Sequence, residues 1–185
     1  TCASSKTSIA LAHVVKERDL QKTIGMTSKG NVEFCESLGC YDQIITYDEA
    51  QTLDASNPII IVDMAGNFSA MKALHEHFQD NVKYSCSVGA THQANQKDFN
   101  VGDMNSFPGA KPTFFFAPTQ AQKRTEEWGA GEVQKRIGLS LKDFQQYSDQ
   151  WMQINRGRGL DVIETTFAKV VQGDMSPHKG LILSV

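Results

Sequence analysis

The sequence predicts an α/β fold in which helices and parallel strands alternate in a doubly wound sheet. Three observations support this prediction. Short apolar runs alternate with helix-length segments between residues 5 and 116, and turn residues separate them. The run 58–63 is almost wholly apolar, as a strand covered on both faces must be. The spacing of the strands suits helical crossovers, which make neighbouring strands parallel.

The first half of the chain is predicted to hold three strands. The expected elements are a helix at 5–17, a strand at 23–27, a helix at 31–38, a strand at 43–46, a brief turn or helix at 48–53 and a strand at 58–63. The first helix lacks proline and glycine and has Ile9, Ala12 and His13 on one side, with Ser4 as its cap. Gly39 stops the second helix, at the position that glycine favours after a last turn.

The rest of the chain is predicted to add two strands, a helical extension and a terminal strand. The expected elements are a helix at 69–78, a strand at 82–88, a loop at 89–112, a buried strand at 113–116, helices at 120–137, 140–154 and 160–171, and a terminal strand at 180–185. A loop as long as 89–112 is uncommon in compact domains unless it borders a site. We therefore expect one domain over 1–185, with a core at 1–117 and a helical extension at 118–172.

The predicted sheet lacks its first strand. A Rossmann-like doubly wound sheet begins with a central strand that leads into the first helix. This sequence begins at Thr1, already in the turn that follows such a strand. A sheet without its centre would leave backbone groups unpaired. We therefore expect an absent N-terminal domain or another chain to supply the strand, and the run 180–185 could pair with the same absent material.

Composition and residue spacing argue against several classes of function. The chain has 18 Lys and Arg against 21 Asp and Glu, so it lacks the basic excess that nucleic-acid binding needs. It has no run of about 20 apolar residues and no signal-peptide pattern of charged and then apolar residues, so we expect no membrane partner and a cytoplasmic location. The four cysteines suit neither a disulfide framework nor a zinc site and are expected to be free. His75 and His77 lie on a predicted helix and point about 200° apart, so we expect no metal site.

The turn before the first helix is a candidate phosphate site. Residues Ser4, Ser5, Lys6 and Thr7 occupy the position where a Rossmann domain binds pyrophosphate on the N–H groups of a helix N-terminus. Small residues let phosphates approach the backbone, the hydroxyls can donate, and Lys6 adds positive charge. The glycine fingerprint is absent, however, and a helix cap rich in serine and threonine explains this segment equally well.

The loop after the 23–27 strand is a candidate site for a 2′-phosphate. An NAD site places an acidic residue there, whereas a 2′-phosphate prefers cationic and hydroxyl partners. This sequence has Thr27, Ser28, Lys29 and Asn31 at that point and no carboxylate. Tyr47, just past the next strand, could hold the same adenosine end. The alternatives are a solvated turn and ordinary edge packing of Tyr47.

Two further turns lie at the carboxyl ends of predicted strands, the edge where open α/β sheets bind ligands. They contain Ala65 and Gly66 in one case and Val88 and Gly89 in the other, and glycine lets the backbone pass close to a cofactor. Tight structural turns would also use glycine. His92, in the long loop, could donate to a carbonyl or a ribose, although a single loop histidine is more often incidental.

Taken together, these segments resemble the cofactor domain of medium-chain dehydrogenases/reductases. The nearest characterised branch is that of the zinc-independent quinone oxidoreductases and enoyl reductases. A closer likeness is to an uncharacterised branch, a domain of unknown function, which also accommodates the 115–120 stretch. The segments that carry the resemblance are 3–5, 24–28, 31–34, 37–39, 41–47, 62–67, 88–89 and 115–120.

The resemblance implies an NADP(H) site. It puts Ser4, Ser5, Lys6 and Thr7 at the pyrophosphate, Ser28, Lys29, Asn31 and Tyr47 around the 2′-phosphate, and Ala65, Gly66, Val88, Gly89, Phe116 and Ala117 towards the nicotinamide. In this superfamily a GroES-like domain precedes the cofactor domain, and the last strand returns to it. Lys6 and Ser8 depart from the family pattern of a small residue and a glycine, and a larger side chain at Ser8 would crowd helix against strand.

The expected function is NADPH-dependent hydride transfer to a quinone, enone or carbonyl acceptor, which makes a small molecule the substrate. No proton donor can be assigned, and the chain by itself is expected to be inactive because half of the substrate pocket would be absent. The alternatives are a non-catalytic Rossmann-type interaction module that has lost the glycine fingerprint, and a site for another small nucleotide. Trp128 and Trp151 are either packing anchors or part of a homodimer face.

Overall fold

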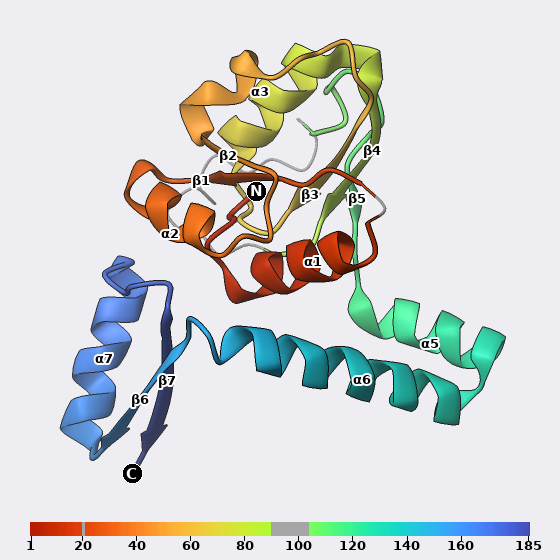
Figure 1. Cartoon of the computed structure of the whole chain (residues 1–185). Helices are drawn as coiled ribbons and strands as arrows, with labels where there is room; N and C mark the ends of the chain where they lie inside the picture. Colours follow the sequence, from red (N-terminus) through yellow and green to blue (C-terminus); the bar gives the residue numbers. More distant parts are fainter. Residues whose placement is uncertain (20, 90–103) are drawn as a thin grey trace. The chain divides into compact units, whose positions relative to one another are not determined.

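The computed structural model describes residues 1–19, 21–89 and 104–185 (Figure 1). The chain divides into two compact units, Thr1–Gln134 and Lys135–Val185. Both contain short parallel sheets and helices, so the predicted mixed α/β class is confirmed. None of the described helices combines the length and the apolarity that crossing a bilayer requires.

The first unit contains every element predicted up to residue 87, most of them within one or two residues of the expected bounds. Its strands are β1 (Ile24–Thr27), β2 (Gln43–Thr46), β3 (Ile59–Asp63), β4 (Val82–Ser87) and β5 (Thr113–Phe114). Its α-helices include α1 (Lys6–Glu17), α2 (Val32–Ser37), α3 (Phe68–Phe78) and α5 (Ala117–Trp128), and 3₁₀ helices cover Lys29–Asn31, Tyr47–Thr52 and Gln79–Asn81. Gly39, with a φ of 65°, follows α2 as predicted.

The N-terminal segment (residues 1–3) lies between two parallel sheets (Figure 1). One sheet pairs β1 with β2, and the other has the order β3-β4-β5. The backbone N–H of Ala3 donates to Met26 O of β1 at 3.0 Å, and the nitrogen of Thr1 donates to Val62 O of β3 at 2.7 Å. The order across the unit is therefore β2, β1, the N-terminal segment, β3, β4, β5.

Gly25 allows the N-terminal segment to approach β1. A Cβ at Gly25 would lie 2.6 Å from the Ile44 side chain and 2.9 Å from the Cβ of Ala3 and from the Tyr41 ring. Real Cβ atoms do not come this close to other heavy atoms. The hydroxyl of Tyr41 also donates to Ala3 O at 2.8 Å. The missing side chain of Gly25 thus leaves room for the N-terminal segment beside β1, and the hydrogen bond from Tyr41 holds the segment there.

The core of the first unit lies between α3 and the strands. Met71 and Phe78 of α3 are buried and belong to the same cluster as Ile61, Val82 and Phe107. In Figure 1, α1 and α3 lie on opposite sides of the strands. On α1, the predicted inner residues Ile9, Ala12 and His13 are buried.

Two strand predictions were wrong about burial. Ile60 in β3 is 62% exposed, and its neighbour across the pair, Tyr84, is 45% exposed, so β3 is not covered on both faces. The expected buried strand at 113–116 is reduced to Thr113–Phe114, and Phe114 is 74% exposed. An apolar run indicates that a strand could be buried on both faces. Whether it is buried depends on which helices or strands pack against it, and the run itself does not reveal them.

The helices after residue 116 break at a different place from the one predicted. The structure has α5 at Ala117–Trp128 and a continuous α6 at Ala130–Ser148, with Gly129 at a φ of 81° between them. The predicted break fell at Gly138, which α6 includes. Glycine inside a helix costs only about 1 kcal/mol relative to alanine, and the flanking turns can offset that cost. Trp128 is 42% exposed under the guanidinium of Arg124, so it is no core anchor.

The second unit is a parallel strand pair joined by a helix. Strand β6 (Gln153–Arg158) leads into α7 (Leu160–Gln172), and β7 (Lys179–Ser184) then pairs with β6 from Gln153↔Lys179 to Arg158↔Ser184. The predicted helix at 160–171 and the terminal strand are confirmed. The predicted helix at 140–154 was wrong over its last six residues: 149–152 lie outside any helix, and Gln153 and Ile154 begin β6, which was not predicted. Strand β7 finds its partner within this chain, contrary to the expectation that absent material supplies one.

Candidate functional site

Helix α1 begins with a serine cap, one residue later than predicted. Ser5, not Ser4, is the N-cap, and its Oγ accepts a hydrogen bond from Ser8 N at 3.3 Å. The hydroxyl of Ser4 is engaged elsewhere, by Asn31. Lys6 and Thr7 form the exposed first turn, and loss of hydration lowers the pKa of the Lys6 ammonium. The first turn of α1 therefore combines a cation and hydroxyls with the N–H groups of a helix start.

Ser8 lies on α1, and its side chain is buried against the N-terminal segment. Its Oγ donates to Thr1 O at 3.0 Å. This hydrogen bond ties the first turn of α1 to the N-terminal segment, and the hydroxyl satisfies a carbonyl that a glycine would leave to other partners.

Asn31 joins two of the predicted binding segments. Its Nδ2 donates to Ser4 Oγ at 3.2 Å and to Ser28 Oγ at 3.1 Å. Both amide hydrogens are used, and both serine oxygens act as acceptors. Neither hydroxyl donates to any other residue in the described part of the chain. Each keeps its own hydrogen to offer to an anion, while Ser28 and Lys29 are exposed to solvent.

Thr27 and Tyr47 lie behind this bridge. Thr27 is fully buried, and its hydroxyl oxygen has no hydrogen-bond partner among the described residues, so it is directed into the protein. Burial raises the pKa of Tyr47 above its ordinary range, and a hydrogen bond to the backbone of Cys2 opposes that rise. Tyr47 therefore contacts the N-terminal segment with a protonated hydroxyl, which differs from the expected position around a 2′-phosphate.

A buried aspartate organises the turn after β3. Asp63 is 2% exposed and accepts hydrogen bonds from Ala65 N at 3.0 Å and Gly66 N at 3.1 Å. It also accepts one from the hydroxyl of Thr1, and so links the turn to the N-terminal segment. Gly66 has a φ of 69°, which favours glycine. Asp63 is not among the predicted site residues, although an aspartate three residues before a glycine at a strand end is a signal of such a turn.

The turns after β3 and β4 lie side by side. The N–H of Val88 donates to Asp63 O at 2.8 Å, and a Cβ on Gly89 would come within 3.3 Å of Met64 O. The buried Ser87 Oγ has no hydrogen-bond partner among the described residues. Ala65 is fully buried, so only its backbone could contribute to binding.

The chain after β5 reaches the same strand end. Phe115 N donates to Ser87 O at 2.9 Å, and α5 starts at the exposed Ala117. Phe116 is 54% exposed, and its ring stacks on that of Phe114 with centroids 6.4 Å apart. The predicted nicotinamide residues are thus assembled around the ends of β3, β4 and β5. His92 lies outside the described residues.

The histidines on α3 have structural partners. His75 is fully buried, with Nδ1 2.8 Å from Pro108 O and Nε2 3.0 Å from Ser85 Oγ. His77 Nε2 lies 2.8 Å from Leu53 O. The described residues contain no cluster of His, Cys, Asp or Glu suited to a metal, and none of the four cysteines forms a disulfide.

The candidate site therefore has three parts at one edge of the strands. Serine hydroxyls lie on two turns, each turn carries one exposed lysine, and glycine-containing loops follow the carboxyl ends of parallel strands.

A family model described as a protein of unknown function, DUF2855, matches residues 1–176. The chain belongs to the DUF2855 family. Neither the curated proteins nor the solved structures contain a match to this DUF2855 protein. The match covers all of the candidate site and most of the second unit.

Proposed function

We propose that the first unit of this DUF2855 protein is a Rossmann-like domain that binds NADP(H). In the full protein it would serve hydride transfer to a quinone, enone or carbonyl acceptor, as in the medium-chain dehydrogenases/reductases that the sequence resembles. The hydrogen-bonded bridge at Asn31 is the observation that carries the proposal.

The strand order supports a dinucleotide site. From the N-terminal segment, β1 and β2 follow on one side and β3, β4 and β5 on the other. Doubly wound sheets bind dinucleotides where the order reverses in this way, outside the carboxyl ends of the strands. That point is occupied here by the N-terminal segment, and α1 begins directly after it.

The chemistry of the bridge supports a phosphorylated ligand. Asn31 holds the hydroxyls of Ser4 and Ser28 with their hydrogens available, in two turns that a dinucleotide would contact at its pyrophosphate and at its ribose. Lys29 adds a cation beside Ser28. The β1 end carries no carboxylate to accept ribose hydroxyls, which favours NADP(H) over NAD(H).

Two nearby carboxylates compete for the same cation. Hydrogen bonds from Thr46 lower the pKa of Asp48 and of Glu49, and the charge of Lys29 contributes to both shifts. A bound 2′-phosphate would have to attract Lys29 more strongly than these exposed carboxylates do. Since both are already held by Thr46, they are poorly placed to follow the lysine towards the ligand.

When bound, the cofactor would supply the hydride, and the protein would position and shield it. The turns at Gly66 and Gly89 would bring backbone close to the nicotinamide, with Phe116 beside them. No side chain of the described residues is assigned as a proton donor, and the acceptor is a small molecule whose remaining contacts would come from outside this unit. Four cysteines without a disulfide suit a reducing compartment such as the cytoplasm.

The second candidate is a non-catalytic binding module. It is favoured by Ile60 and Tyr84, which form an exposed apolar pair on the sheet and could contact a protein partner. This module would bind no dinucleotide, so ligand titration separates the two candidates.

The test compares site variants with matched exposed controls in a calorimetric titration with NADPH. Ser28→Ala and Lys29→Ala should each weaken NADPH binding by about fivefold to tenfold, a loss of about 1 to 1.4 kcal/mol. Ser69→Ala and Lys22→Ala should change it by less than about twofold. Equal effects of site and control variants would refute the proposed site.

A further inference from the structure

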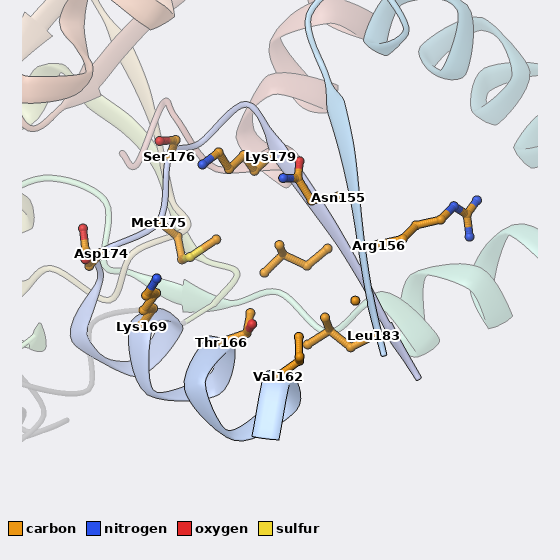
Figure 2. Close-up of a pocket in the computed structure, with 12 residues that line it drawn as sticks. Asn155, Arg156, Val162, Thr166, Lys169, Asp174, Met175, Ser176, Lys179 and Leu183 are labelled. Atoms are coloured by element: carbon orange, nitrogen blue, oxygen red, sulfur yellow. The ribbon is translucent and has the colours of Figure 1, made fainter. Parts of the chain in front are cut away.

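The second unit contains a pocket that the proposed cofactor site does not use. It has a volume of about 370 Å³ and lies between α7, the two strands β6 and β7, and the loop that follows α7 (Figure 2). Val162 and Thr166 line it from the helix, and Leu181 and Leu183 from β7. A volume in this range accommodates a small organic molecule but not a dinucleotide.

Close packing at one end of the helix leaves the hollow at the other. A Cβ on Gly157 would lie 2.7 Å from Val162 and 2.9 Å from Leu183, so α7 approaches the strands as far as glycine permits near its start. The chain then leaves α7 at Gly173, which has a φ of 75°, and Asp174 and Ser176 line the pocket on the way to β7. The hollow is therefore a consequence of how this crossover is built.

Two lysine ammonium groups line the pocket, from opposite walls. Lys169 comes from the last turn of α7 and Lys179 from the first residue of β7. Within the described part of the chain, neither lysine forms an ion pair or a side-chain hydrogen bond. Asp174 is the one carboxylate among the lining residues, which leaves a net positive charge. Arg156 also lines the pocket, but Figure 2 shows its guanidinium pointing away.

Polar donors complete the lining. Asn155, Thr166 and Ser176 each present a side chain to the hollow, and none of them has a side-chain hydrogen bond to another described residue. The C-terminus of α7 carries partial negative charge and opposes an anion. Lys169, in that last turn, offsets this effect locally, and Lys179 adds a second cation from the opposite wall.

We propose that this pocket binds a small phosphate monoester. A phosphate group offers acceptor oxygens for two ammonium groups, two hydroxyls and an amide, and carries about −1.5 to −2 charge at neutral pH. Leu181, Leu183 and Val162 provide a short apolar floor for the carbon skeleton of the ester. The proposal concerns the second unit alone and does not depend on the cofactor site.

The experiment titrates the full chain with glucose 6-phosphate, inorganic phosphate and uncharged glucose, and follows backbone amide shifts in ¹H–¹⁵N spectra. We expect saturable shifts at residues 155–157 and 174–180 with both phosphates and none with glucose. Lys169→Ala and Lys179→Ala should each weaken binding by about tenfold, whereas Arg156→Ala should change it by less than about twofold. NADPH-dependent shifts at residues 4–8 and 28–31 should be unchanged in all three variants.

Two results would overturn the proposal. One is the absence of saturable shifts in the second unit with either phosphate. The other is binding that the lysine variants leave unaltered. Thermal unfolding of each variant, together with the milder Thr166→Val, distinguishes a lost contact from a lost fold: a folded Thr166→Val protein must bind the phosphates more weakly than the wild type.

Discussion

The side-chain amide of Asn31 donates to Ser4 Oγ at 3.2 Å, and this contact connects the turn before α1 to the loop after β1. The same nitrogen lies 3.1 Å from Ser28 Oγ. One residue therefore fixes the spacing of two hydroxyls on different turns and leaves their hydrogens free to donate. The NADP(H) proposal depends on this geometry more than on any single charge.

Replacing Asn31 should separate ligand binding from stability. Asn31→Ala removes two partly exposed hydrogen bonds, which should lower the free energy of unfolding by about 1 to 2 kcal/mol. NADPH affinity should fall by about tenfold or more, because the two serines lose their fixed orientation. Calorimetric titration and urea unfolding measure the two effects. An unchanged NADPH affinity in a folded Asn31→Ala protein would show that the bridge has no role in binding.

Replacing two glycines by alanine should change the free energy of unfolding in opposite directions. Gly25→Ala forces a Cβ against Ile44, Ala3 and Tyr41 and should destabilise the protein by about 1 to 3 kcal/mol. Gly138 lies inside α6 with open space where its Cβ would be, so Gly138→Ala should stabilise by about 0.5 to 1 kcal/mol. Urea unfolding of both variants makes this comparison. A neutral Gly25→Ala would mean that the N-terminal segment is not packed on β1 as described.

The buried carboxylate of Asp63 should be far more important for stability than an exposed one in a similar turn. Asp63→Ala leaves the N–H groups of Ala65 and Gly66 without their acceptor and should cost about 2 to 4 kcal/mol. Asp54 accepts hydrogen bonds from Ser56 and Asn57 at an exposed turn, and Asp54→Ala should cost less than about 1 kcal/mol. Equal losses in chemical denaturation would rule out this organising role for Asp63.

His75 should make stability depend on pH. Burial lowers its pKa below the ordinary value of 6.5, and the charge of Lys111 acts in the same direction, while a hydrogen bond to Pro108 opposes them. Below pH 6.5 the unfolded chain takes up a proton that the native imidazole resists. The His75 contribution is therefore complete above pH 6.5 and is lost as the pH falls towards the native pKa.

The measurement is the free energy of unfolding between pH 5 and 8 for the wild type and for His75→Gln. The wild type should lose stability more steeply on acidification through this range than the variant does. If the unfolding free energies of the two proteins changed with pH at the same slope, His75 would titrate alike in the folded and unfolded chain.

Much of the first unit could be predicted from the sequence because each of its elements has a local signal. The bounds of β2 were predicted to the residue, since Ile44, Ile45 and Thr46 are β-branched and turn residues flank the segment. Strand β6 was missed because Asn155, Arg156 and Arg158 give it no apolar pattern, and its stability comes from pairing with β7. Local sequence carries no information about a partner more than twenty residues away.

The site was predicted as a set of residues but not as a set of contacts. The sequence placed Ser4, Ser28 and Asn31 near the ends of successive elements, which was enough to expect them at one edge. It could not show that Asn31 links the two serines, or that Asp63 holds the neighbouring turn, because these contacts depend on folded geometry. Tyr47 looked like a ligand contact, yet its hydroxyl is used by the backbone of Cys2.

The most direct test of the NADP(H) proposal is a calorimetric titration of the wild-type chain with NADPH and, separately, with NADH under identical salt conditions. The two ligands differ only in the 2′-phosphate that Ser28 and Lys29 are proposed to bind. We predict that NADPH binds at least about tenfold more tightly, a difference of about 1.4 kcal/mol. Equal affinity for the two dinucleotides, or binding of neither, would contradict the proposal.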